Sequence, residues 1–173
     1  MAGEEIFDIV DPDTNRVLGQ ADRKKVHGNP SLVHQAVHVL VFNNAGHLYL
    51  QKRSPHKDIQ PDKWDTSVGG HVQSGESLVE AVRRETMEEL NICPSEFIHL
   101  YQYLMSNSLE TELVNTYKIV YNDSLIPNPE EITEGRFWTP EEIERNLNQG
   151  VFTPNFEEEW IKYKEDQNDS PTH

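Results

Sequence analysis

Three glutamates, Glu85, Glu88 and Glu89, are spaced three and four residues apart in a segment with the composition of a helix. Residues at these separations share one face of an α-helix, because each residue advances about 100° around the axis. Like charges held this close destabilise a helix unless a cation neutralises them. Carboxylate oxygens suit hard divalent cations, so the spacing indicates a site for Mg²⁺ or Mn²⁺.

The same three carboxylates have a simpler explanation in a strongly acidic chain. The sequence contains 30 Asp+Glu against 15 Lys+Arg, a formal net charge of −15. Runs of acidic residues are usually solvated helix faces. Taken alone, the three glutamates are best explained as a solvated helix face. The residues around them favour a metal site instead.

Those residues resemble the signature of the Nudix family, G-x5-E-x7-R-E-U-x-E-E-x-G-U, in which U is apolar. The matching positions are Gly70, Glu76, Arg84, Glu85, Glu88, Glu89 and Ile92. Two positions depart from the signature: Thr86 replaces the first apolar residue and Asn91 replaces the last glycine. Asparagine tolerates the left-handed backbone that often ends a helix, so Asn91 can preserve the turn. A chance match at so many spaced positions is improbable.

The resemblance implies a metal-dependent diphosphate hydrolase. Glu85, Glu88 and Glu89 would bind one or more Mg²⁺ or Mn²⁺ ions, with the backbone carbonyl of Gly70 as a further ligand. The same glutamates are the candidate catalytic residues. The ions would bridge diphosphate oxygens and lower the pKa of an attacking water.

Two further roles follow from the same resemblance. Arg84 would pair with Glu76 and brace the preceding loop against the helix, which is a structural role. Hydrolysis also needs a general base, for which a helix glutamate or an acid of a later loop could serve. We take Glu131 as the loop candidate, with Glu130 and Glu134 as alternatives.

A longer stretch, from His27 to about Trp138, is similar to type I isopentenyl-diphosphate isomerase and the hydrolases grouped beside it. The residues that carry this resemblance are His27, His34, Val41-Phe42, Lys52-Arg53, residues 64–71 and Gly75-Glu76-Ser77. In the isomerase, histidines at the places of His27, His34 and His71 bind a metal. The resemblance therefore implies a second metal site at these three residues.

The carboxylates expected beside those histidines are less well matched. An ungapped alignment places them near Leu113 and Asn115, neither of which is acidic. Glu110 or Glu112 could take their place if the alignment slips. Metal sites need a full set of ligands, so the second site depends on this point.

The chemistry of the isomerase, proton transfer at carbon, uses a cysteine and a glutamate. Its cysteine falls at Gly69, which has no side chain, and the single cysteine, Cys93, lies beyond the helix. The helix glutamates, which the isomerase keeps only in part, are complete. These differences favour hydrolysis over isomerisation.

The leading hypothesis is hydrolysis of a diphosphate linkage in a nucleoside diphosphate or a derivative of one, a small-molecule substrate. Lys52, Arg53 and Lys57 are candidates to bind its phosphates, although such side chains are more often simply solvated. Two alternatives remain: an isoprenoid diphosphate hydrolase or isomerase-like enzyme, and a non-catalytic nucleotide-sensing Nudix domain. A sensing domain would be expected to have lost one or more of the helix glutamates.

Periodicity and turn residues predict the elements that position these residues. A capping box from Ser77 to Glu80 predicts a helix from about Leu78 to Leu90, with Val79 among the residues that face a sheet. Strands are expected at residues 6–10, 17–19, 34–42, 48–53, 97–105, 113–121 and 136–138, and further helices after Thr139 and over 155–164. Residues 22–31 are expected to form a connector.

The resemblance implies an α+β fold, the α/β/α sandwich of the Nudix family with a mixed sheet. The first two strands add an N-terminal β-hairpin at about residues 5–21. We expect a single domain over residues 1–165 and a disordered tail over 166–173.

Composition excludes several classes of partner and setting. The charge of −15 would repel a nucleic-acid polymer. Neither a signal peptide nor a run of about 18 apolar residues, the length that spans a bilayer, is present. A single cysteine forms no intramolecular disulfide, so a cytoplasmic protein is expected. The sequence does not determine the oligomeric state.

Overall fold

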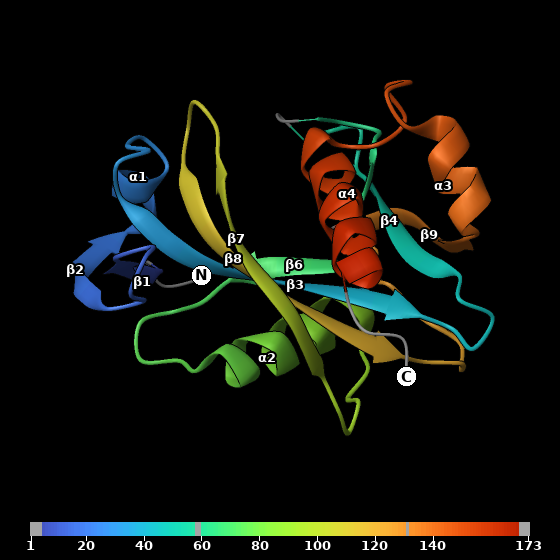
Figure 1. The fold of residues 1–173 in the computed structure, drawn as a ribbon, viewed down its shortest axis with the longest axis horizontal. Coiled ribbons are helices and arrows are strands. Elements are labelled where there is room, and N and C mark those ends of the chain that lie inside the picture. The colour runs from blue at the N-terminus through green and yellow to red at the C-terminus, as the bar shows by residue number, and fades with distance from the viewer. Residues whose placement is uncertain (1–4, 58–59, 131, 170–173) are drawn as a thin grey trace.

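A computed structural model describes residues 5–57, 60–130 and 132–169. A nine-stranded mixed sheet lies in the middle of the molecule, with helix α2 against one face and helices α3 and α4 on the other (Figure 1). The strands are β1 (Ile6–Val10), β2 (Val17–Asp22), β3 (Val33–Phe42), β4 (Leu48–Arg53), β5 (Trp64–Asp65), β6 (Val68–His71), β7 (Ile98–Ser106), β8 (Thr111–Val120) and β9 (Ile132–Trp138). The helices are α1 (Arg23–Val26), α2 (Leu78–Leu90), α3 (Pro140–Asn146) and α4 (Pro154–Asp169). This is the expected α+β sandwich, and β1 and β2 form the N-terminal hairpin.

Strand β3 is the centre of the sheet, and the sheet forks beside it. β3 pairs antiparallel with β6 and parallel with β8 along its whole length. β3 and β4 pair at Phe42 and Leu48, next to the turn that joins them, after which β4 pairs with β5 and β9. The two strands therefore diverge, and the segment from β5 to β6 crosses between them.

Ser67, between β5 and β6, holds the two arms of the fork together. Its hydroxyl accepts a hydrogen bond from the backbone N–H of Val41 in β3 at 3.0 Å and donates one to the backbone oxygen of Tyr49 in β4. The side chain of Gln51 donates to the backbone oxygen of Ser67. Ser67 is fully buried, so these bonds also satisfy polar groups that have no access to water.

Helix α2 begins and ends where the sequence predicts. The hydroxyl of Ser77 accepts a hydrogen bond from the N–H of Glu80 at 3.1 Å. Asn91 ends the helix in the left-handed region at φ 56° and ψ 38°, and its N–H bonds to the oxygen of Met87. The prediction for Val79 was wrong: it is 45% exposed, because it lies in the first turn, before the buried stretch of the helix begins at Ala81.

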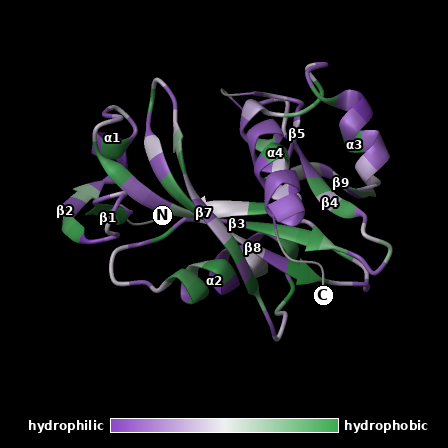
Figure 2. Ribbon diagram, in the orientation of Figure 1, coloured by the Kyte–Doolittle hydropathy of each residue, from purple (hydrophilic) through white to green (hydrophobic). Residues whose placement is uncertain are grey.

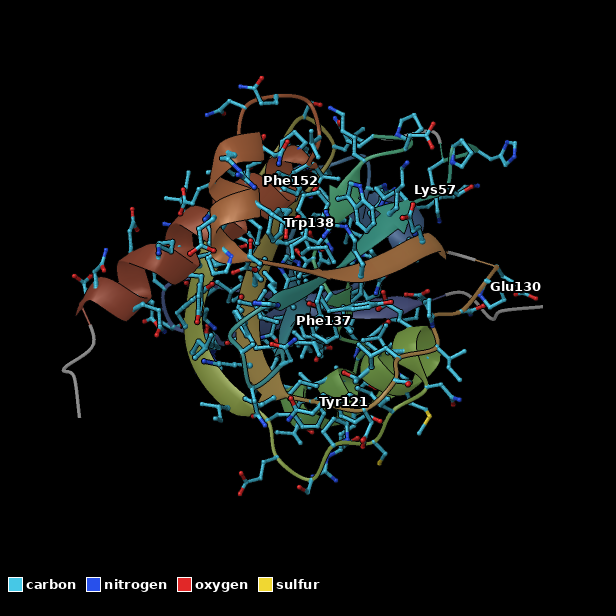
Figure 3. The ribbon with its side chains drawn as sticks, turned by 90° about the vertical axis from the view of Figure 1, so that its right-hand side faces the viewer. Lys57, Tyr121, Glu130, Phe137, Trp138 and Phe152 are labelled. Carbon is cyan, nitrogen blue, oxygen red and sulfur yellow. The ribbon has the colours of Figure 1, made fainter. Side chains whose placement is uncertain are left out.

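Two hydrophobic cores lie on the two faces of the sheet. One packs Ala81, Val82 and Leu90 of α2 against β3, β6 and β8, and the other packs α3 and α4 against β3, β4 and β9. Phe137 and Trp138, neighbours in β9, point to opposite cores, as alternation along a strand requires (Figure 3). The central strands are mostly hydrophobic, whereas α3 and the visible side of α4 are mostly hydrophilic (Figure 2).

Two further predictions were wrong, one about an expected connector and one about the expected C-terminal tail. Residues 23–26, expected within a connector, form α1, whose N-terminus is capped by the carboxylate of Asp22 accepting from the N–H of Lys25. Helix α4 continues to Asp169, so residues 166–169 of the expected disordered tail are helical, and residues 170–173 lie outside the described residues. None of the helices in the described ranges combines the length and apolar character needed to cross a membrane.

Candidate active site

A cleft with a volume of about 650 Å³ opens at the fork of the sheet. This size lies within the roughly 300–1,000 Å³ of typical small-molecule sites. Its lining includes Glu85, Glu88 and Glu89 of α2, Gln51, Lys52 and Arg53 of β4, Lys57 of the following loop, Gly69, Gly70 and His71 of β6, His38 of β3 and Glu112 of β8. The cleft therefore brings the three helix glutamates and the three candidate phosphate-binding cations together.

The helix glutamates differ in how deeply they lie. The side chain of Glu85 is 14% exposed and that of Glu88 is 58% exposed. A Cβ atom on Gly70 would overlap the carboxylate of Glu85, so only glycine lets the backbone of β6 approach this carboxylate. Burial raises the pKa of Glu85, and the charge of Glu88 adds to the effect, although Arg84 opposes it.

Arg84 and Glu76 form a two-point ion pair below the cleft. The Nε and Nη2 atoms of Arg84 donate to the two carboxylate oxygens of Glu76 at 2.7 and 2.9 Å. Nη2 also donates to the backbone oxygen of His71 at 3.0 Å, and Nη1 to Glu85 at 2.8 Å. The hydrogen bonds from Arg84 lower the pKa of Glu76. One guanidinium thus fixes the loop after β6 against α2.

Glu89 lies where α2 meets the fork. The backbone N–H of Gly69 donates to its Oε2 at 3.3 Å, and the side chain of Gln51 approaches its Oε1 at 3.4 Å. Gln51 was not predicted as a site residue, because no motif surrounds it. Its position depends on the divergence of β3 from β4.

The candidate cations lie on the opposite wall of the cleft from α2. Lys52 and Arg53 end β4, and an Nη1 atom of Arg53 is 3.6 Å from the carboxylate of Asp65. Lys57 lies on the loop that follows β4 (Figure 3). The cleft thus combines carboxylates that suit a metal ion with cationic side chains that suit phosphates.

Two of the three acids considered as general bases, Glu130 and Glu134, lie away from the cleft. Glu131 falls outside the described residues. Glu130 is exposed at the tip of its loop (Figure 3), and Glu134 is exposed on β9; neither is among the described residues that line the cleft. The described acids that do line it are the helix glutamates, Glu112, Asp65 and Glu5.

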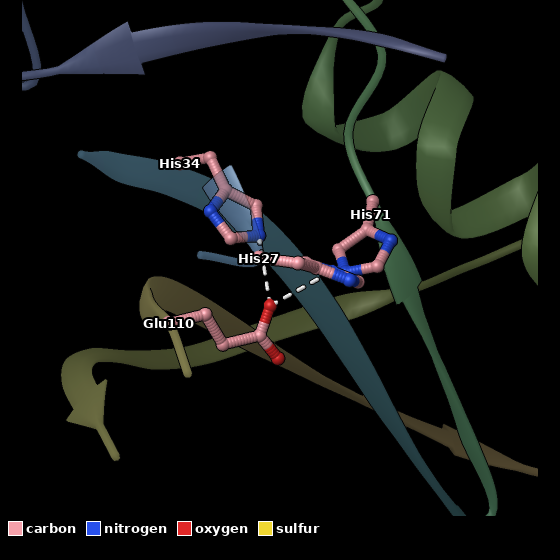
Figure 4. A group of neighbouring side chains, drawn as sticks. All are labelled: His27, His34, His71 and Glu110. Carbon is pink, nitrogen blue, oxygen red and sulfur yellow. Dashed lines mark ion pairs between the residues drawn. The ribbon is translucent and has the colours of Figure 1, made fainter. Parts of the chain in front are cut away.

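His27, His34 and His71 come together beside the cleft, which His71 lines, and a carboxylate oxygen of Glu110 lies close to all three (Figure 4). One oxygen of Glu110 is 3.0 Å from Nε2 of His27 and 3.6 Å from Nε2 of His34. Glu112 completes the cluster at 3.6 Å from Nε2 of His34 and 3.3 Å from Nε2 of His71. The ligand atoms of the histidines and Glu110 all lie within 4.8 Å of one another.

The carboxylates beside the histidines are thus Glu110 and Glu112. The ungapped alignment, which placed them near Leu113 and Asn115, was wrong. The reason is the parallel pairing of β3 with β8, which sets His34 opposite Glu112. Although burial opposes it, the nearby imidazoles of His34 and His71 hold the pKa of Glu112 well below its usual range.

The donor set fits a bound metal ion. Nε2 of His27, both ring nitrogens of His34 and one oxygen of Glu110 are buried without a well-aligned hydrogen-bond partner. Buried polar atoms are nearly always satisfied, so the clustered atoms of His27, His34 and Glu110 call for a further partner. Three imidazoles with carboxylates suit a borderline ion such as Zn²⁺.

Comparison with known proteins agrees with this geometry. The model of the NUDIX domain family matches residues 32–156. An uncharacterized Nudix hydrolase of Yersinia pestis is 34% identical over 150 residues, which cover 87% of this chain and 80% of that protein. The crystal structure of DR0079 from Deinococcus radiodurans has a TM-score of 0.78 at 30% identity and covers 91% of this chain and 98% of that one.

A more distant structure shows the fold alone. The NUDIX domain of Shewanella oneidensis NrtR, solved in complex with ADP ribose, has a TM-score of 0.60 at 15% identity and covers 84% of this chain and 92% of that one. The matched family model spans most of the chain and includes the whole of the signature around α2. The chain therefore belongs to the NUDIX domain family and is a Nudix pyrophosphohydrolase, an enzyme class that uses a divalent metal ion.

Proposed function

We propose that this enzyme hydrolyses the diphosphate linkage of a nucleoside diphosphate, or of a derivative of one, with Mg²⁺ held by Glu85, Glu88 and Glu89. The observation that supports this proposal is the meeting of three helix carboxylates and three cationic side chains in one cleft. Mn²⁺ is the alternative ion, because it accepts the same oxygen ligands.

Different residues of the cleft would have different roles in hydrolysis: binding the metal ion, binding the phosphates and positioning the glutamates. A divalent ion bound by the helix glutamates and the carbonyl of Gly70 would neutralise phosphate charge and acidify a water molecule. Lys52, Arg53 and Lys57 would hold the phosphates by charge-assisted hydrogen bonds. Arg84, tied to Glu76, would keep the glutamates and the loop after β6 in place.

We further propose that the enzyme is a hydrolase of the isopentenyl-diphosphate isomerase-like subgroup, with a second metal site. His27, His34, His71, Glu110 and Glu112 would hold the second ion, and their unsatisfied buried atoms support this. An isoprenoid diphosphate remains the alternative substrate. A cytoplasmic setting is part of the proposal, because Cys93 is exposed and unpaired and reducing compartments keep such thiols free.

A substrate screen tests the proposed activity. Formation of monophosphate products from nucleoside diphosphates, nucleoside diphosphate derivatives such as ADP-ribose, and isoprenoid diphosphates would be compared in Mg²⁺ and in EDTA. We expect turnover of a nucleotide that requires Mg²⁺. Preferential turnover of an isoprenoid diphosphate would replace the proposed substrate with the alternative one, and nucleotide binding without turnover would contradict the catalytic proposal.

A further inference from the structure

A fully buried carboxylate lies between α4 and the sheet. Glu159 of α4 is 0% exposed and accepts hydrogen bonds from the hydroxyl groups of Tyr101, Tyr103 and Thr116, at 3.1 Å for each of the latter two. Its Oε1 is also 2.7 Å from Nδ1 of His38 in β3. Burying a carboxylate is costly unless partners compensate for lost water, and these side chains, from three strands, supply that compensation.

The contact with Glu159 fixes the orientation of the His38 ring. Because the carboxylate accepts the hydrogen of Nδ1, the opposite edge of the ring, with Cδ2 and Nε2, points away from α4. That edge faces Gly69, where an added Cβ atom would lie 3.4 Å from Cδ2 and 3.8 Å from Nε2. His38 is 11% exposed at its side chain and lines the cleft, so the small exposed part belongs to the active site.

Gly69 connects this ring edge to the metal-binding helix. Its backbone N–H donates to Oε2 of Glu89 at 3.3 Å, while its other side faces His38. An imidazole nitrogen and a candidate metal ligand therefore approach the same glycine, which has no side chain to separate them. His38 and Glu89 both line the cleft in which the proposed diphosphate would bind.

If His38 served only to stabilise the buried carboxylate of Glu159, this would explain the position of its Nδ1 atom but not that of its Nε2 atom. Tyr101, Tyr103 and Thr116 already supply three donors to Glu159, and a structural donor needs no second nitrogen at the cleft. The charge balance points the same way: a protonated imidazole neutralises Glu159 and still presents one N–H to the cleft.

We infer that His38 is a substrate-binding residue, which in its cationic form donates a hydrogen bond from Nε2 to a phosphoryl oxygen of the diphosphate. Glu159 is the positioning residue that orients the ring and keeps its proton. This inference rests on the proposed function and adds a residue that the Nudix signature does not contain.

The protonation of His38 is consistent with this role. Burial lowers the pKa of His38, but the hydrogen bond and charge of Glu159 outweigh it, and Glu112 of β8 and Asp65 of β5 act in the same direction, so the pKa is raised. As pH rises through that raised pKa, Nε2 loses its hydrogen and can no longer donate. Affinity for a diphosphate should therefore fall over that range.

The test uses the full chain with Mg²⁺ and methylenediphosphonate, a diphosphate analogue that cannot be hydrolysed. In the wild-type protein, the nitrogen NMR signal of His38 Nε2 should shift when the analogue binds. In His38→Asn, the amide replaces Nδ1 as the donor to Glu159 but nothing replaces Nε2. We expect a dissociation constant about 10- to 100-fold higher, the range for losing one hydrogen bond to a charged group.

Two further variants separate binding from folding. His99→Asn changes an exposed histidine of β7 that does not line the cleft and should leave the dissociation constant unchanged. Glu159→Gln should move the pH-dependent loss of affinity to lower pH, because His38 loses its anionic partner. A structural role alone would change stability without moving that pH range.

The outcomes distinguish this inference from the proposed function. If the wild-type Nε2 signal does not respond to the analogue, or if His38→Asn binds it as tightly as wild type, the inference is wrong while nucleotide hydrolysis can stand. The NMR result decides even if the variants fold poorly. If the wild-type protein neither binds the analogue nor hydrolyses any diphosphate, the proposed function fails and this inference fails with it.

Discussion

The residues of the acidic helix face are held in different ways, and Glu89 is the one bound to the fork of the sheet. The N–H of Gly69 and the amide of Gln51 both contact its carboxylate. Glu88, by contrast, is largely exposed. A change at Glu89 therefore removes a carboxylate that contacts with β4 and β6 hold in place. For this reason Glu89 is the best single residue at which to test the metal site.

Replacing Glu89 by Gln should preserve the fold and reduce Mg²⁺-dependent turnover by about 100- to 1,000-fold, the loss typical when one preorganised electrostatic group is removed. Steady-state kinetics across a range of Mg²⁺ concentrations would measure it. Glu80→Gln, an exposed change on the same helix, is the control. Turnover equal to wild type in Glu89→Gln would exclude this carboxylate from the mechanism.

A glycine is favoured at position 70 because its backbone lies close to the side chain of Glu85, and not because its φ angle is positive. A Cβ atom there would overlap the carboxylate of Glu85. Gly70→Ala should displace the carboxylate of Glu85 and reduce turnover, with little effect on the free energy of unfolding, because the end of a flexible side chain can move aside. Gly19→Ala, with open space around its added Cβ atom, is the control in urea denaturation and kinetics. Equal turnover in the two variants would contradict this reasoning.

At the scale of elements, helix α2 depends on the residue that ends it. Asn91 has a φ of 56°, a left-handed conformation that costs residues with ordinary side chains roughly 1–2 kcal/mol. Asn91→Ala should therefore lower the free energy of unfolding by about 1 kcal/mol, whereas Asn91→Gly should be tolerated. Urea denaturation of the two variants would test this, and equal stability of both would show that the turn is not strained.

Helix α4 is attached to the sheet by an ion pair that responds to pH. Burial raises the pKa of Glu159, but the hydrogen bond and charge of His38 outweigh it and lower the pKa overall; the pKa of His38 is raised. The stability from this pair is therefore fully present between the ordinary values of 4.5 and 6.5. It is lost as pH falls through the pKa of Glu159 and as pH rises through that of His38.

Unfolding free energies measured by urea across this pH range would test the pair. The wild-type protein should be more stable inside the range than on either side by an amount that Glu159→Gln reduces. An identical pH profile in the variant would show that the pair contributes no pH-dependent stability.

At the scale of the whole molecule, the two candidate metal sites share strand β6, and only His71 and Glu112 of the histidine cluster are among the described residues that line the cleft. Strand β6 carries Gly70 toward α2 and His71 toward the histidine cluster, while Glu112 reaches the cleft from β8. The two sites have different ligands, oxygen alone in one and mainly nitrogen in the other. They should therefore select different ions.

Added Zn²⁺ should raise the melting temperature through the histidine cluster, because an ion that binds only the folded state stabilises it, by about 2.7 kcal/mol at 100 times the dissociation constant. His34→Ala should abolish this gain, and Glu89→Gln should keep it. Thermal denaturation with elemental analysis of the dialysed proteins would measure both. Equal metal content in wild type and His34→Ala would rule out the second site.

The local parts of this architecture were determined by the sequence itself. The face shared by Glu85, Glu88 and Glu89, the start of α2 at Ser77 and its end at Asn91 all depend on residues within a few positions of one another. Helical periodicity and capping act over that range, so they can be read from one chain. The four-residue helix α1 was missed because it is too short for periodicity to appear.

Other parts were decided only by the tertiary structure. Glu110 and Glu112 join the histidines because β3 and β8 pair in parallel with His34 opposite Glu112, and a single sequence does not fix the register of distant strands. His38 meets Glu159 across 121 residues, and no local pattern links them. Such contacts depend on how the layers pack, because burial brings together groups that the order of the chain keeps apart.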